Sequence, residues 1–232
     1  MNREAPQCYH LADLGESYKM DSIGHLCEAF KGTYAGEAMD ALQTLYSTIE
    51  TETTAFCKEN EIACGPGCGT CCEHFMPDIT TTEARLVAAY LLFIKKDEAL
   101  IEKVKESAGN TTGPCPLYCF NTPYHCSVYP SRPLICRLFG ACANQDKNGN
   151  AVFRRCRYNV EKTMPEFLTL GGEVTVMQDY AYLLRSLDQE SEEASMLGDA
   201  VSSQIEQLRF LASMLDLSDR PNPDDTPNPI AS

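Results

Sequence analysis

Cysteine is the residue that most limits how this chain can fold. The sequence has 13 cysteines in 232 residues, and most of them lie in two stretches, 64–72 and 115–136, that are rich in glycine and proline. Such irregular backbone has little packing energy to offset its conformational entropy. A bound metal can contribute on the order of 10 kcal/mol to folding. The two stretches therefore predict metal binding between Cys64 and Cys136.

The setting of these cysteines favours thiols over disulfides. The first residues lack the apolar core of a signal peptide, and no apolar run approaches the roughly 18 residues that cross a bilayer. We therefore expect a soluble, cytoplasmic protein, in a compartment where thiols stay reduced. The cysteine number is odd, and Cys71 and Cys72 are adjacent, which suits disulfide geometry poorly.

The spacing of the cysteines predicts which of them bind metal. The first group reads Cys64-x3-Cys68-x2-Cys71-Cys72, and a two-residue gap lets two sulfurs converge on one ion or cluster. The predicted ligands are Cys64, Cys68, Cys71, Cys72, Cys115, Cys126 and Cys136. Together they supply more than four thiolates. A structural zinc site and an iron–sulfur cluster (4Fe-4S) both use ligand sets of this kind, so both remain open.

The charge distribution supports an anionic centre in this region. The chain has 33 acidic and 19 basic residues and a net charge of -14, which argues against nucleic acid or an anionic membrane as a partner. The segment 115–158 is instead basic, with six Lys and Arg residues against one Asp. Arg132 and Arg137 are predicted to lie just outside the ligands and offset thiolate charge. Alternatively, these arginines pair with carboxylates of the acidic helices.

Apolar periodicity predicts a mainly α fold, a helical scaffold that holds two irregular cysteine-rich loops. Thr80 and Glu83 form a capping-box pattern, and Asn148-Gly149 indicates a small β-hairpin within 143–155. The predicted helices are 37–59, one from Thr80 to about Ile94, 97–107, 174–187 and 193–215. We expect a loosely ordered segment 1–35, a single helical domain 36–218 with its motif region at 60–160, and a disordered tail 219–232.

Three motifs in order resemble a known family. They are Cys68-Gly69-Thr70-Cys71-Cys72 followed by Thr82-Glu83, then Cys115-Pro116-Leu117, and then Cys126 to Phe139 with its Arg132-Pro133-x-x-Cys136-Arg137 core. The pattern resembles the zinc- or iron-chelating CxxCxxCC cysteine-cluster family, which includes flagellin N-methylase-like and iron–sulfur proteins. The resemblance covers about residues 60–160 and implies metal binding. Cys64 departs from the family spacing, because three residues instead of two separate it from Cys68.

The remaining cysteines and histidines carry weaker indications. Isolated cysteines often act as small apolar side chains, which is our interpretation of Cys8, Cys27 and Cys57. Cys119, Cys142 and Cys156 lie near the motifs and would suit a second site or a lid. His74 and His125 are within two residues of a motif cysteine and are either ligands or surface imidazoles.

Three functions agree with this sequence. The first is a metal-binding protein that carries an iron–sulfur cluster and so has redox capacity. The second is a structural zinc module that mediates contacts with a protein partner. The third, protein lysine N-methyltransferase activity, follows only from the family resemblance, so enzymatic activity is left open.

Overall fold

The computed structural model describes residues 21–62, 69–119, 124–157, 166–187 and 194–215. In chain order its elements are α1 (Asp21–Ala29), α2 (Tyr34–Glu59), α3 (Thr70–His74), β1 (Asp78–Ile79), α4 (Thr81–Ala89), the π-helical turn η3 (Tyr90–Lys95), α5 (Glu98–Glu106), the 3-10 turn η4 (Tyr129–Ser131), α6 (Leu134–Leu138), β2 (Asn144–Gln145), β3 (Ala151–Arg154), β4 (Phe167–Thr169), α7 (Met177–Leu187), β5 (Ser195–Met196) and α8 (Leu197–Met214). The prediction of a mainly α fold is confirmed.

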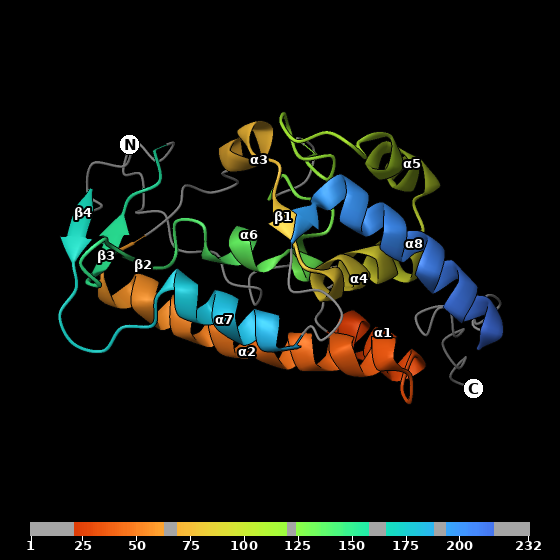
Figure 1. Ribbon diagram of the computed structural model, residues 1–232, viewed down its shortest axis with the longest axis horizontal. Helices are drawn as coiled ribbons and strands as arrows, with labels where there is room; N and C mark the ends of the chain where they lie inside the picture. The colour runs from red at the N-terminus through yellow and green to blue at the C-terminus, as the bar shows by residue number, and fades with distance from the viewer. Residues whose placement is uncertain (1–20, 63–68, 120–123, 158–165, 188–193, 216–232) are drawn as a thin grey trace, which may run out of the picture.

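Helix α4 lies at the centre of the molecule. It packs between α8 and α2, and Figure 1 shows α8 crossing its upper side while α2 runs below it. Every residue from Thr82 to Ala89 is buried, because the helix is covered on opposite sides by these two longer helices. The apolar core therefore reaches from Ile23 of α1 to Ala212 of α8.

The start of α4 is fixed by the predicted capping box. The Thr80 side chain accepts a hydrogen bond from the Glu83 backbone N–H, and the Glu83 carboxylate accepts one from the Thr80 N–H. These bonds satisfy donors that a helix N-terminus otherwise leaves unpaired. Leu86 of this helix and Leu91 of the turn that follows it are fully buried. Residues 90–95 continue as a π-helical turn instead of an α-helix.

The longest helix, α2, forms the base of the molecule. It extends from Tyr34 to Glu59 and contacts α1 at its start and α7 further along, as Figure 1 shows. Its buried side chains include Met39, Leu42, Tyr46 and Ile49, the three-and-four spacing of an amphipathic helix. The segment expected to be loosely ordered includes α1, in which Ile23 is fully buried.

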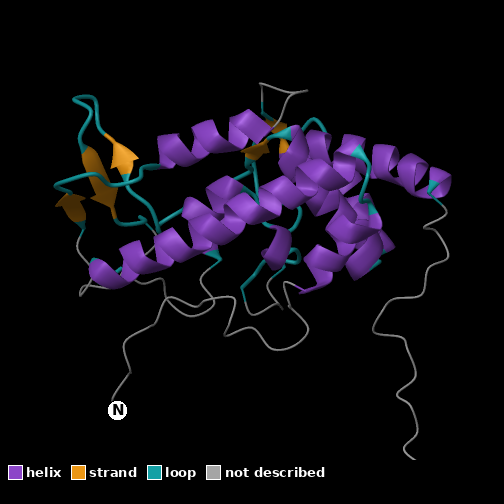
Figure 2. Cartoon of the chain, turned by 90° about the horizontal axis from the view of Figure 1, so that it is seen from below, coloured by secondary structure: helices purple, strands orange, loops and turns teal. Residues whose placement is uncertain are grey.

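The predicted β-hairpin is confirmed. Strands β2 and β3 pair antiparallel, with Asn144 opposite Val152, and Gly149 in the turn has a positive φ of 86°. A third strand, β4, pairs antiparallel with β3 and was not predicted. Figure 2 shows this small sheet at one end of the molecule, and a second sheet pairs β1 with β5 near its middle.

Two short helices that the sequence did not predict lie within the irregular cysteine-rich loops. Helix α3 lies in the first cysteine-rich stretch, and α6 follows Pro133 in the second. Each has only five residues, which is too short to show an apolar period in a sequence. Within the described part of the chain, no helix combines the length and apolarity needed to cross a membrane. The predicted tail 219–232 lies outside the described residues.

Candidate metal centre

The two cysteine-rich stretches meet around one cavity of about 210 Å³. The cavity lies where α2, α3 and α6 approach the segments 115–118 and 124–133. Seven cysteines line it: Cys57, Cys71, Cys72, Cys115, Cys126, Cys136 and Cys156. A concave, cysteine-lined site drawn from several chain segments is a natural position for a metal centre.

Five of the predicted ligands are among these residues, namely Cys71, Cys72, Cys115, Cys126 and Cys136. The other two, Cys64 and Cys68, lie outside the described residues. The role of all seven as ligands stays a prediction, whereas the convergence of the five on one cavity is an observed property of the fold.

Backbone hydrogen bonds hold the cysteine segments together. The Cys115 N–H donates to the carbonyl of Cys72 over 2.9 Å, which joins the end of the first stretch to the start of the second. Further along, the Ser127 N–H donates to the Leu117 carbonyl over 3.0 Å, and the Cys119 N–H to the His125 carbonyl over 3.1 Å. The fold therefore sets the relative position of Cys72, Cys115 and Cys126 without side-chain bonds.

Gly69 allows a close approach that a larger residue would prevent. A Cβ atom at this position would lie 2.3 Å from Cβ of His125. Its φ of -122° is open to any residue, so glycine is required here for space and not for backbone conformation.

Three buried thiols of the cavity have raised pKa values. Burial raises the pKa of Cys115 to about 12, and burial also raises the pKa values of Cys126 and Cys136. Arg132 opposes this shift at both Cys126 and Cys136, because its positive charge favours thiolates.

The sulfur atoms of Cys71 and Cys72 are 3.9 Å apart. That separation resembles the roughly 3.8 Å expected between two thiolates on one tetrahedral zinc with Zn–S bonds of about 2.3 Å. Across the described residues, however, no three Cys, His, Asp or Glu side chains are gathered tightly enough to hold a single ion.

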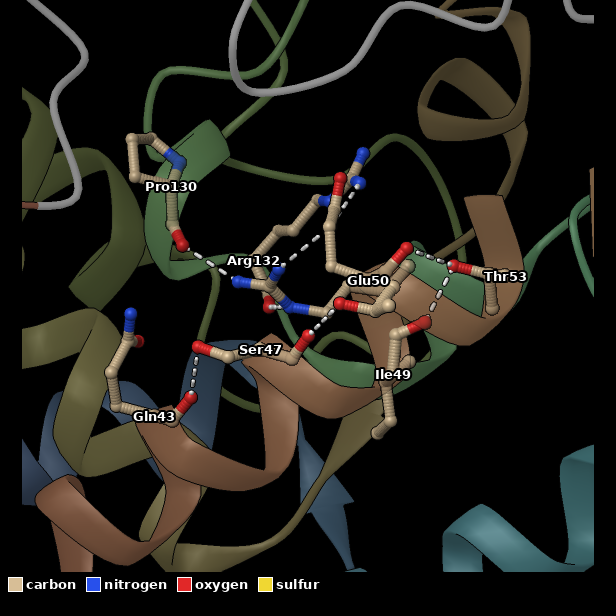
Figure 3. A network of polar contacts seen from close by, with 9 residues as sticks. Gln43, Ser47, Ile49, Glu50, Thr53, Pro130 and Arg132 are labelled. Carbon is tan, nitrogen blue, oxygen red and sulfur yellow. Dashed lines mark hydrogen bonds and ion pairs between the residues drawn. The ribbon is translucent and has the colours of Figure 1, made fainter. Parts of the chain in front are cut away.

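Glu50 of α2 binds both predicted arginines. Its carboxylate is 3.9 Å from Nη2 of Arg132 and 3.6 Å from Nη1 of Arg137, and Figure 3 shows Glu50 beside Arg132. The structure thus agrees with the alternative expectation, in which these arginines pair with a carboxylate of an acidic helix. One carboxylate between two guanidinium groups leaves a net positive charge at the cavity wall, so the pairing is compatible with a role in offsetting thiolate charge.

Glu83 connects α4 to the cysteine region, a role that the sequence did not indicate. Beyond its capping bonds, its carboxylate accepts a hydrogen bond from the Tyr46 hydroxyl over 3.0 Å and one from the Leu134 N–H over 2.6 Å. Leu134 is the first residue of α6, which carries Cys136. A single buried carboxylate therefore positions α6 against α2 and α4. Its capping motif was visible in the sequence, but the two long-range partners were not.

The other sequence candidates divide between the cavity and the core. Cys27 and Cys142 are buried away from the cavity lining, and Cys57 is buried but lines it. His125 also lines the cavity, whereas the His74 side chain is 55% exposed beside Glu73. Cys8 lies outside the described residues.

This architecture defines a class: a helical protein with a cysteine-lined, metal-chelating domain. Residues 63–157 match the family model CxxCxxCC, whose description is “Putative zinc- or iron-chelating domain”. The matched segment is less than half of the 232 residues and contains all seven predicted ligands. No curated protein and no solved structure matches the chain.

Proposed function

We propose that this protein carries an iron–sulfur cluster in the cysteine-lined cavity, with ligands drawn from the seven predicted cysteines. The observation that supports the proposal is the convergence of Cys71, Cys72, Cys115, Cys126 and Cys136 on one cavity. These residues come from separate segments of the second and third fifths of the chain, and a convergent set of cysteine thiols is the ligand set that iron–sulfur clusters use.

The arrangement of the thiols favours a cluster over one structural zinc ion. A closed zinc site needs four ligands within about 2.3 Å of one atom. The sulfur atoms of Cys71 and Cys72 are 3.9 Å apart, but no set of three ligands among the described residues is compact enough for one ion. A cluster attaches each thiolate to a different iron, so its ligands stand farther apart.

The charges at the cavity wall also favour a thiolate-rich centre. Arg132 and Arg137 share the single carboxylate of Glu50, and both line the cavity. The surplus positive charge would offset the negative charge of a cluster with four thiolate ligands. A cluster in this position would give the protein the capacity to exchange electrons with a protein partner.

Lysine N-methyltransferase activity has weaker support. Cavities that enclose a drug-sized organic ligand measure about 300–1,000 Å³, and this cavity measures about 210 Å³. The volume suits an inorganic centre better than a nucleoside methyl donor. A structural zinc module remains the main competing function, and the test below separates it from the cluster.

The decisive experiment is metal analysis of the full chain purified without oxygen. We expect brown protein with broad sulfur-to-iron charge-transfer absorption and matching amounts of iron and acid-labile sulfide. Cys126→Ser and Cys136→Ser should lose this absorption. Cys142→Ser is the matched control, because Cys142 is a buried cysteine whose thiol donates to the Ala143 carbonyl over 3.3 Å, away from the cavity.

Two results would refute the proposal. Colourless protein with stoichiometric zinc would establish the structural zinc module instead. Full iron retention in both Cys126→Ser and Cys136→Ser would remove these residues from the ligand set. Methyl transfer from S-adenosylmethionine to lysine, by protein free of iron, would support the enzymatic alternative.

A further inference from the structure

The two arginines at the cavity wall differ in what their nitrogen atoms contact. All three side-chain nitrogen atoms of Arg137 contact an oxygen atom of the protein. Its Nε donates to the Arg132 carbonyl over 3.0 Å, and its Nη2 donates to the Pro130 carbonyl over 2.6 Å. Its Nη1 faces Glu50 at 3.6 Å. The group is buried and lies 4.0 Å above the ring of Tyr46. Arg137 therefore fastens the turn at 129–131 to α6, which is a structural role.

Arg132 has one buried N–H donor, at Nε, that makes no hydrogen bond with the described residues. Its guanidinium lies 4.0 Å above the Tyr129 ring, and its Nη2 faces Glu50 at 3.9 Å, a contact that Figure 3 shows from close by. Its Nε is buried and makes no hydrogen bond with any acceptor of the described residues. A buried N–H without an acceptor is unfavourable, and such groups in native proteins call for a partner that the bare chain does not supply.

The surroundings of Arg132 indicate what that partner is. Arg132, Cys126 and Cys136 all line the same cavity. The positive charge of Arg132 acts on both thiols and favours their ionised form. The ring of Tyr129 on one side and the carboxylate of Glu50 limit how far the guanidinium can turn. An anionic sulfur in the cavity would be a suitable acceptor for a fixed, charged N–H donor.

We propose that the Nε–H of Arg132 donates a hydrogen bond to a sulfur atom of the metal centre, and that this bond sets the reduction potential of the centre. The inference rests on the proposed cluster. Hydrogen bonds and positive charge near the sulfur atoms stabilise the more negative, reduced state of a cluster. Arg132 is thus a positioning and tuning residue, whereas Arg137 maintains the fold.

Variants at position 132 should lower the reduction potential of the cluster that they retain. In Arg132→Met both the donor and the charge are lost, whereas Arg132→Lys keeps the charge and loses the planar Nε donor. The carbonyl of residue 132, which accepts from Arg137, remains in both. We expect the ratio of reduced to oxidised cluster at a fixed potential to fall about tenfold in Arg132→Met, which equals about 59 mV for a one-electron couple.

The matched control is Arg154→Met. Arg154 is an exposed arginine of β3 that lies 5.5 Å above the Phe167 ring and does not line the cavity. The measurements are redox titration followed by visible absorption, resonance Raman spectra of the iron–sulfur stretches, and thermal melting to confirm folding. A fall in potential and shifted stretches in both Arg132 variants, with neither in Arg154→Met, would support the inference.

The results separate this inference from the proposed function. Wild-type protein with a cluster, combined with unchanged potential and Raman bands in Arg132→Met and Arg132→Lys, would overturn the role of Arg132 alone. If wild-type protein holds only zinc, the cluster is refuted. The same variants are then compared after exchange with Co²⁺, and an unshifted thiolate-to-cobalt absorption band in both would overturn the sulfur–Arg132 bond as well.

Discussion

Replacing Gly69 by alanine tests whether the contact between the two cysteine stretches supports metal binding. The new Cβ would lie 2.3 Å from Cβ, 2.8 Å from Cγ and 2.9 Å from Cδ2 of His125. Carbon atoms pack at about 3.5–4.0 Å, so the two segments would have to separate by roughly 1 Å or more. A rotation of the His125 side chain cannot relieve the shortest contact, because the position of Cβ is fixed by the backbone.

The magnitude follows from the cost of overpacking, about 1–3 kcal/mol. In the metal-free protein, the segment that carries Cys71 and Cys72 can move away from His125 and release this strain. A bound metal that ties Cys71 or Cys72 to Cys126 would hold the segments at their present separation. Most of the cost then falls on the metal-bound state, and metal affinity should drop by about 5- to 150-fold.

The assay is metal retention against increasing chelator concentration, together with thermal melting of the metal-free form. Gly24→Ala is the control, because no heavy atom lies within 4 Å of a Cβ at this exposed position of α1. Alanine there should leave affinity unchanged and raise helix stability slightly. Unchanged metal affinity in Gly69→Ala would refute the reasoning, because it would show that metal binding does not need this contact.

Two further predictions concern the scaffold. Glu83→Ala should lower the free energy of unfolding by about 3–5 kcal/mol, because it leaves the Tyr46 hydroxyl and the Leu134 N–H buried without their acceptor. Urea unfolding measures this loss, and the less disruptive Glu83→Gln serves for comparison. A loss under about 1 kcal/mol would contradict the linking role of Glu83. Hydrogen bonds from the backbone N–H and the side-chain amide of Asn150, and then from the Asn148 N–H, hold the pKa of Asp146 below its ordinary value of 3.8. Because the folded pKa is the lower one, the carboxylate stabilises the β2–β3 turn above pH 3.8 and this contribution is lost as the pH falls through the folded pKa. The protection factor of the Asn150 amide, which is the exchange rate corrected for its intrinsic pH dependence, should therefore fall only at acidic pH, and a fall near neutral pH would contradict the assignment.

Local sequence signals were sufficient for most of the helices. The periodicity of 37–59 predicted α2 to within three residues of its observed start, and Thr80 with Glu83 marked the start of α4. Asn148-Gly149 predicted the β2–β3 hairpin. These signals work because amphipathic spacing, capping bonds and positive φ are properties of neighbouring residues.

Elements that depend on distant partners were missed. Helices α3 and α6 are too short to show a period, and β4 pairs with β3 across a connection of more than ten residues. Glu50 belongs to no recognisable sequence motif, yet its carboxylate forms ion pairs with both Arg132 and Arg137. The sequence also did not distinguish the roles of Arg132 and Arg137, because these roles depend on which carbonyl groups lie within hydrogen-bonding distance of each side chain.

The sequence by itself determined that this chain would have helices flanking two cysteine-rich segments, and that its basic charge would be concentrated beside those cysteines. Only the tertiary structure decided that Cys71, Cys72, Cys115, Cys126 and Cys136 line a single cavity. The physical reason is that helix and turn signals act over a few residues. The meeting of the cysteine segments depends instead on contacts between segments far apart in the chain, such as the Gly69–His125 packing and the Cys115–Cys72 hydrogen bond.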